Sequence, residues 1–116
     1  MFDAMDHYQL ARQLYEAGDY RTALLELESL LADEPVGRDV LELAGLAYFK
    51  SAQLGRAEAT FSRLIERDPS DAYAHFALGR TLERQSRKRE AKSCYQLAVV
   101  MDPTPDYRLA LDRLSA

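Results

Sequence analysis

Apolar side chains recur every three or four residues along most of the chain, and short polar breaks interrupt them at regular intervals. This spacing places the apolar residues on one face of a helix. The breaks contain Gly18 and Asp19, then Pro35, Pro69 and Pro103, which are residue types that end one helix or begin the next. The pattern therefore predicts an all-α fold.

The same pattern predicts three pairs of helices and a further helix at the C-terminal end. The first helices of the pairs are expected at about residues 5–17, 38–51 and 72–85, and the second helices at about residues 20–32, 54–67 and 88–101. Asp19 and either Ser70 or Asp71 suit the N-cap position of the helices that follow them. The turn at residues 85–87 lacks a glycine, so its prediction depends on the register of the other turns.

Seven positions recur with a spacing of 34 residues. The middle copy reads Leu41, Ala44, Gly45, Tyr48, Ala57, Phe61 and Pro69; the same columns hold His7, Leu10, Ala11, Leu14, Ala23, Leu27 and Pro35 before it, and His75, Leu78, Gly79, Leu82, Ala91, Tyr95 and Pro103 after it. This period and these residue types resemble the tetratricopeptide-repeat (TPR) family, with Leu41 in place of the usual Trp. The resemblance covers residues 4–105 well and the tail in part.

The resemblance implies a single TPR domain over residues 1–116. Its fold would be a short right-handed superhelix of three helix-turn-helix repeats, at about 4–37, 38–71 and 72–105, with a capping helix at about 106–116. Tyr107 falls in the column of Tyr73, but Asp112 and Arg113 occupy columns that are expected to be small or apolar. That departure is typical of a capping helix with one face in water. A chain that ends inside a fourth repeat would look the same, so both interpretations stay open.

Gly45 and Gly79 recur inside first helices, where the first copy has Ala11. Because a glycine inside a helix costs about 1 kcal/mol relative to alanine, its recurrence predicts the close approach of another helix.

Composition excludes several classes of protein. With 47% hydrophobic and 29% charged residues, the chain has the composition of an ordinary soluble globular protein, and no apolar run approaches the roughly 20 residues that span a bilayer. The N-terminus has no cationic flank before an apolar segment, so we expect no secretory signal and a cytoplasmic location. Cys94 is the only cysteine, and we expect it to be a small packing residue.

Charge is distributed unevenly. Residues 1–42 carry three Arg and ten Asp or Glu, a net charge of −7, whereas residues 43–116 have a net charge of +3. The overall acidity argues against a nucleic-acid partner. The concentrated basic stretch, Arg84, Arg87, Lys88, Arg89 and Lys92, is expected to be a solvated turn; the alternative is a surface for an acidic partner or for the N-terminal third of another copy.

No pattern indicates catalysis. The chain has no recognisable nucleophile-base signature and no glycine-rich phosphate loop, so we expect no enzyme activity and no cofactor. His7 and His75 lie in one column of different repeats, and no further His or second Cys completes a zinc set. We expect packing histidines and no metal site.

The family resemblance implies that the first helices line a concave groove that binds a peptide segment or a protein surface. The predicted function is therefore a protein-protein interaction scaffold, with a self-associating module or a regulatory fragment of a larger protein as alternatives. Chaperone-binding members grip a terminal carboxylate with Lys and Asn, but the matching columns here hold Tyr8 and Arg12. We expect apolar groups of the partner near the aromatic residues and acidic groups near the two arginines of a groove formed by Tyr8, Arg12, Tyr15, Glu42, Leu46, Phe49, Tyr73, Phe76 and Arg80.

Overall fold

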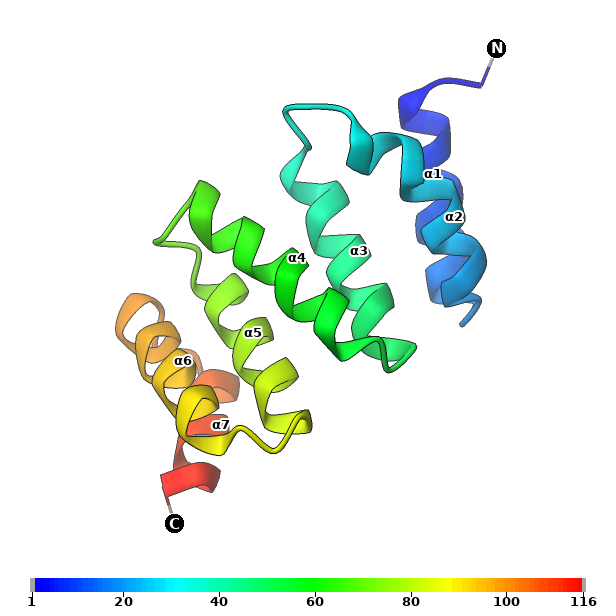
Figure 1. Cartoon of the computed structure of the whole chain (residues 1–116). Coiled ribbons are helices and arrows are strands. Elements are labelled where there is room, and N and C mark those ends of the chain that lie inside the picture. Colours follow the sequence, from blue (N-terminus) through cyan, green and yellow to red (C-terminus); the bar gives the residue numbers. More distant parts are fainter. Residues whose placement is uncertain (1, 116) are drawn as a thin grey trace. The chain divides into compact units, whose positions relative to one another are not determined.

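The computed structural model describes residues 2–115, which form helices joined by short turns and contain no strand (Figure 1). This confirms the predicted all-α fold class. The elements in chain order are α1 (Ala4–Glu16), α2 (Tyr20–Ala32), α3 (Arg38–Lys50), α4 (Leu54–Arg67), α5 (Ala72–Arg84), α6 (Lys88–Met101) and α7 (Pro105–Ser115).

The helix boundaries follow the repeat. Helices α1, α3 and α5 begin 34 residues apart, and so do α2, α4 and α6. The predicted bounds of α2, α4 and α6 are correct, and those of the other helices differ by one residue at one or both ends. Of the predicted N-caps, Asp19 accepts a hydrogen bond from the Thr22 amide and Asp71 accepts one from the Ala74 amide.

The turns from α1 to α2, from α3 to α4 and from α5 to α6 share one backbone conformation. Gly18, Ala52 and Ser86 have φ of 85°, 62° and 63°, in the left-handed region. In the last of these turns, the Arg87 amide donates to the Leu82 carbonyl and the Ser86 amide to the Glu83 carbonyl, which is the Schellman pattern that closes a helix end. The turn therefore forms without a glycine, as the register predicts.

The chain divides into two compact units, residues 1–60 and residues 61–116, with the boundary inside α4. In the first unit, α2 packs against α1 and α3. Its core combines small and larger apolar side chains: the buried residues are Ala11, Ala23, Leu27, Leu43 and Ala44. The predicted single domain of 1–116 stays a prediction.

In the second unit, α6 packs against both α5 and α7. The buried ring of Tyr95 fills its core beside Gly79, where a Cβ atom would come within 2.6 Å of the ring carbon Cε1. The predicted close approach at Gly79 is therefore confirmed, and the neighbour is an aromatic side chain of α6. Gly45 is also buried.

Helix α7 attaches to this unit through apolar and charged contacts. Ala110 is buried, and Leu111 and Leu114 pack against the same core. Asp112 is exposed, as expected for a capping helix, but Arg113 forms a two-pronged ion pair with Glu83 of α5. The column expected to face water therefore supplies a contact that holds α7 in place.

Candidate binding cleft

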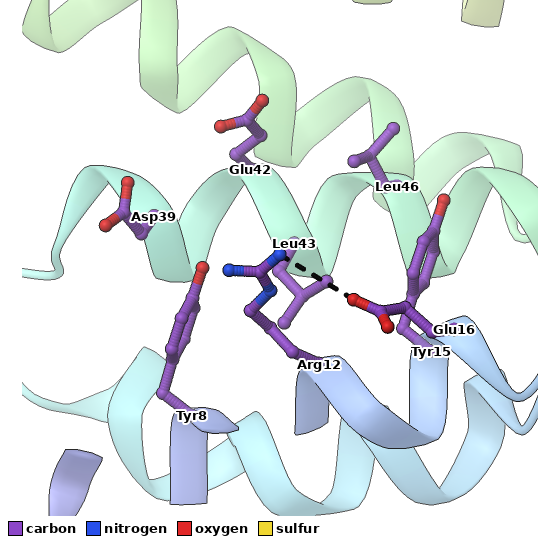
Figure 2. Close-up of a pocket in the computed structure, with 8 residues that line it drawn as sticks. All are labelled: Tyr8, Arg12, Tyr15, Glu16, Asp39, Glu42, Leu43 and Leu46. Carbon is purple, nitrogen blue, oxygen red and sulfur yellow. Dashed lines mark ion pairs between the residues drawn. The ribbon is translucent and has the colours of Figure 1, made fainter. Parts of the chain in front are cut away.

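A cleft of about 360 Å³ opens between α1 and α3 in the first unit (Figure 2). We call it the α1/α3 cleft. It is built from side chains at helical spacing on both helices, so that successive turns contribute one or two wall residues each. Its lining residues are Tyr8, Arg12, Tyr15, Glu16, Asp39, Glu42, Leu43 and Leu46.

The charged groups of the cleft are mostly acidic. Arg12 extends across it and pairs with Glu16 at 3.6 Å, and Glu42 pairs with Arg38 of its own helix at 2.7 Å. Within residues 2–115, Asp39 takes part in no ion pair, and its carboxylate lies on the same side of the cleft as the Tyr8 hydroxyl (Figure 2). The cleft thus contains one carboxylate whose charge is not neutralised by a cation.

The Tyr8 phenol responds to this environment. Its pKa is raised, first because partial burial disfavours the phenolate and then because Asp39 and Glu42 repel it; Arg12 opposes the shift. The phenol therefore stays protonated and available as a hydrogen-bond donor at neutral pH.

A second, mainly apolar hollow adjoins the cleft and shares Tyr8 and Asp39 with it. We call it the Met5/Val40 hollow. Its volume is also about 360 Å³, and its walls are Ala4, Met5, Tyr8, Leu30, Gly37, Arg38, Asp39 and Val40. Met5 is 62% exposed, so an apolar side chain already lies in water there.

In the second unit, helix α5 contributes to an aromatic cluster. Phe76 stacks on Tyr107 of α7 with ring centroids 4.7 Å apart, and the guanidinium of Arg80 lies 5.9 Å from the centroid of the Phe76 ring. Tyr73 and Tyr95 are farther, at 6.4 Å and 5.7 Å from Phe76. Phe76 therefore already packs against other residues of its own unit.

The expected groove residues fall into three groups. Tyr8, Arg12, Tyr15, Glu42 and Leu46 line one cleft, and Tyr73, Phe76 and Arg80 belong to the aromatic cluster. Phe49 was expected on the exposed face, but it is only 7% exposed. A fully buried phenylalanine gains roughly 2 kcal/mol by leaving water, so Phe49 contributes to packing.

Other residues that line these surfaces were not predicted from the sequence. Glu16, Asp39 and Leu43 complete the α1/α3 cleft, and Tyr107 completes the aromatic cluster. The repeat contained a signal for the latter, because Asp39, Tyr73 and Tyr107 lie in one column.

The other candidates take structural roles. His7 bonds through Nδ1 to Glu26 at 2.9 Å, and His75 is 7% exposed with Nε2 2.9 Å from the Pro69 carbonyl oxygen. Cys94 packs against the core of the second unit. In the basic stretch, Arg87 pairs with Glu90 of the next turn. Among residues 2–115, no three His, Cys, Asp or Glu side chains come together as metal ligands, and no helix is long and apolar enough to traverse a bilayer.

Structural comparison places this fold among known helical-repeat proteins. MamA (residues 41 to the end) from Desulfovibrio magneticus RS-1 matches with a TM-score of 0.89 and 24% identity over 97% of this chain and 64% of that chain. The first TPR domain of Spaghetti (RPAP3), solved with the HSP90 peptide SRMEEVD, matches with a TM-score of 0.88 and 18% identity over 97% of this chain and 90% of that chain. At these identities the likeness shows the fold.

Sequence comparison also finds related proteins. Human protein O-mannosyl-transferase TMTC2 is 26% identical over 100 residues, which are 84% of this chain but 12% of that protein. The chain thus spans a small part of that relative and less than two thirds of the MamA chain. The family profile described as "Tetratricopeptide repeat" matches residues 8–54 and residues 43–108. The chain belongs to the tetratricopeptide-repeat family.

Proposed function

We propose that this protein is a non-enzymatic scaffold that binds an extended peptide segment or a protein surface along its first helices. One observation carries the proposal: five of the expected groove residues line a single open cleft between α1 and α3. Helical repeats of this family are interaction modules, and the RPAP3 domain was solved with a peptide bound. We extend this kind of role to the present chain. A cytoplasmic location remains part of the proposal.

Tyr15 and Leu46 are the proposed apolar contacts of the partner in this cleft. Aromatic and apolar side chains in a partly desolvated recess carry much of the energy of an interface. Tyr15 is half-buried and its ring lies 5.3 Å from that of Tyr20, so its position is set before a partner arrives. A wall that is already ordered loses little rotamer freedom on binding.

A selection from a phage-displayed random dodecapeptide library tests this proposal. We expect enriched peptides whose affinity, measured by fluorescence anisotropy, falls by about 2 kcal/mol in a Tyr15→Ala/Leu46→Ala variant. Thermal unfolding of the same variant separates a lost contact from a lost fold. The control is Leu25→Ala, since Leu25 is 58% exposed on α2 and lies outside the cleft.

Failure to enrich any peptide would remove peptide binding as the function. Full affinity of a folded double variant would move the site away from this cleft.

Self-association is the second candidate, and the charge distribution favours it. Residues 1–60 contain eleven acidic and five basic side chains, a net charge of −6, whereas residues 61–116 contain eight acidic and ten basic ones, a net charge of +2. Opposite charges on two parts of a chain attract copies of it weakly, and salt screens that attraction. Light scattering across protein concentration at low and high salt tests this: a constant monomer mass at both would remove the candidate.

A further inference from the structure

The α1/α3 cleft and the Met5/Val40 hollow share Tyr8 and Asp39 as walls, so that an apolar recess adjoins an acidic one. A single extended segment can occupy both, because successive side chains of an extended peptide point to different sides of its backbone. An apolar side chain suits Met5, Leu30 and Val40, which are half-buried or exposed.

Charge defines what fits beside that apolar side chain. Arg12 and Arg38 each have a carboxylate partner on their own helix, Glu16 and Glu42, and Asp39 adds a negative charge that no ion pair within residues 2–115 neutralises. A carboxylate ligand that approached Arg12 would meet the three acidic residues that line the same cleft. A cationic ligand group would instead be attracted by two carboxylates, Asp39 and Glu42, which lie on one wall (Figure 2).

The wider field acts in the same direction. The first unit has a net charge of −6 over residues 1–60, which raises the local concentration of cationic ligands. The alkyl part of a Lys or Arg side chain can lie along Leu43 and Leu46 while its charged end reaches the carboxylates.

We infer that the first unit recognises a basic segment of a partner protein, in which an apolar residue lies next to a lysine or arginine. The apolar residue occupies the Met5/Val40 hollow, and the cationic side chain occupies the α1/α3 cleft against Asp39 and Glu42. This inference rests on the proposed function and reverses the sequence-based expectation that acidic groups of the partner lie near Arg12.

The dodecapeptide selection described above also tests the inference, because it imposes no charge on the winning sequences. We expect enriched peptides to combine an apolar residue with a neighbouring Lys or Arg. The probe is then one enriched peptide labelled with fluorescein, called the winner, together with the same peptide carrying Glu at each Lys or Arg position. The Glu version should lose at least about tenfold in affinity, and binding of the winner should weaken as salt is raised.

Charge reversal on the protein locates the site. Asp39→Lys should weaken binding of the winner by at least about tenfold, whereas Glu28→Lys, the same change of charge at an exposed position of α2, should alter it by no more than about twofold. Asp39 lies in the first turn of α3, where its charge also favours the helix. Asp39→Asn, nearly the same size, is therefore tested in parallel with a thermal melt of each variant.

The outcomes separate the two proposals. Enrichment of acidic peptides would overturn the basic-partner inference and leave peptide binding as the function. No enrichment would overturn both. If Asp39→Lys and Glu28→Lys weakened the winner equally, only the overall field of the unit would attract it, and the assigned site would be wrong.

Discussion

The two units contain equivalent pairs of first helices, α1 with α3 and α5 with α7, and these pairs present different surfaces. Twice the repeat length separates each wall residue of the α1/α3 cleft from its counterpart. The counterparts of Tyr8, Arg12, Tyr15, Glu16, Asp39, Glu42, Leu43 and Leu46 are Phe76, Arg80, Glu83, Arg84, Tyr107, Ala110, Leu111 and Leu114.

Two exchanges explain most of the difference. Where α3 has Asp39, α7 has Tyr107, which stacks on Phe76; where α3 has Glu42, α7 has the buried Ala110. The carboxylates leave one pair of helices open and acidic, while the ring and the small residue let the other pair close on an aromatic cluster. The same repeat thus yields a recess or a packed contact, and the side chains of the wall decide which.

The cores differ in a complementary way. The first unit pairs Ala11 with Leu27 in one buried cluster, and the equivalent positions of the second unit hold Gly79 and Tyr95. A larger residue on α6 is matched by a smaller one on α5. Total volume is conserved although neither residue is, which is what close packing demands.

Gly79→Ala should disrupt this packing and lower the stability more than a substitution at Glu83 or in the turns. A Cβ atom there would lie 2.6 Å from Tyr95 Cε1, so we expect a loss of about 1 to 3 kcal/mol in the free energy of unfolding from overpacking. An ordinary helical Gly→Ala exchange gains about 1 kcal/mol instead. Chemical denaturation measures the sign directly.

Gly55→Ala on α4 is the matched control, because an added Cβ there meets nothing within 4 Å. We expect it to be neutral or stabilising. In a Tyr95→Leu background, which copies the residue of the first unit, Gly79→Ala should cost less than in the natural chain. Equal stabilisation by Gly79→Ala and Gly55→Ala would refute the account of the core.

Glu83→Gln should come next, since Glu83 replaces the Tyr15 of the first unit and ties three helices together. Its carboxylate accepts a hydrogen bond from the Tyr95 hydroxyl at 2.9 Å and an ion pair from Arg113. The Arg113 contact holds the pKa of Glu83 below its usual value of 4.5. We expect a loss of about 1 to 2 kcal/mol at pH 7, because the amide keeps one acceptor but no charge.

The pH dependence gives a second measurement of the same contact. A lowered folded-state pKa stabilises the protein above pH 4.5, and this stabilisation disappears as the pH falls through the lower folded value. The difference between Glu83→Gln and the natural chain should therefore shrink in acid. Glu90→Gln is the control, because its Arg87 pair is exposed and should contribute nothing measurable. A pH-independent difference would mean that shape, rather than charge, holds α7.

Exchanging the turn residues should have the smallest effect, with opposite signs in the two units. Ser86 has φ of 63° and Gly18 has φ of 85° at equivalent positions, where a side chain costs about 1 kcal/mol. Ser86→Gly should stabilise by somewhat less than about 1 kcal/mol, because glycine also loses more backbone freedom on folding. Gly18→Ala should destabilise by a similar amount, and thermal melts of the two variants test the pair. Changes in stability of the same sign in both variants would contradict this prediction.

The helices were predictable because their signals are local. Helical spacing, N-cap residues and turn prolines located α2, α4 and α6 to the residue, and the 34-residue register located the turn at Ser86 even without a glycine. The column of small residues also predicted a close contact at Gly79, but it did not identify Tyr95 as the residue in contact. The right-handed superhelix stays a prediction.

The candidate site was predictable only in part. Register identified Tyr8, Arg12, Tyr15, Glu42 and Leu46 as residues of exposed first-helix faces, and these do line one cleft. It did not identify Asp39 as a wall residue of the cleft, nor did it reveal that Phe49 is buried. A repeat specifies which face of its helix a residue occupies, but not how far the neighbouring side chains cover it.

The sequence by itself determined the secondary structure and the family, because spacing along one chain encodes which residues must leave water together. Only the tertiary structure decided the chemistry of the surfaces. Glu83 meets Arg113 across 30 residues, and Asp39 reaches the surroundings of Tyr8 from another helix. Such pairs depend on the distance and angle between helices. Those quantities follow from the packing of all the side chains between them, and no local pattern records them.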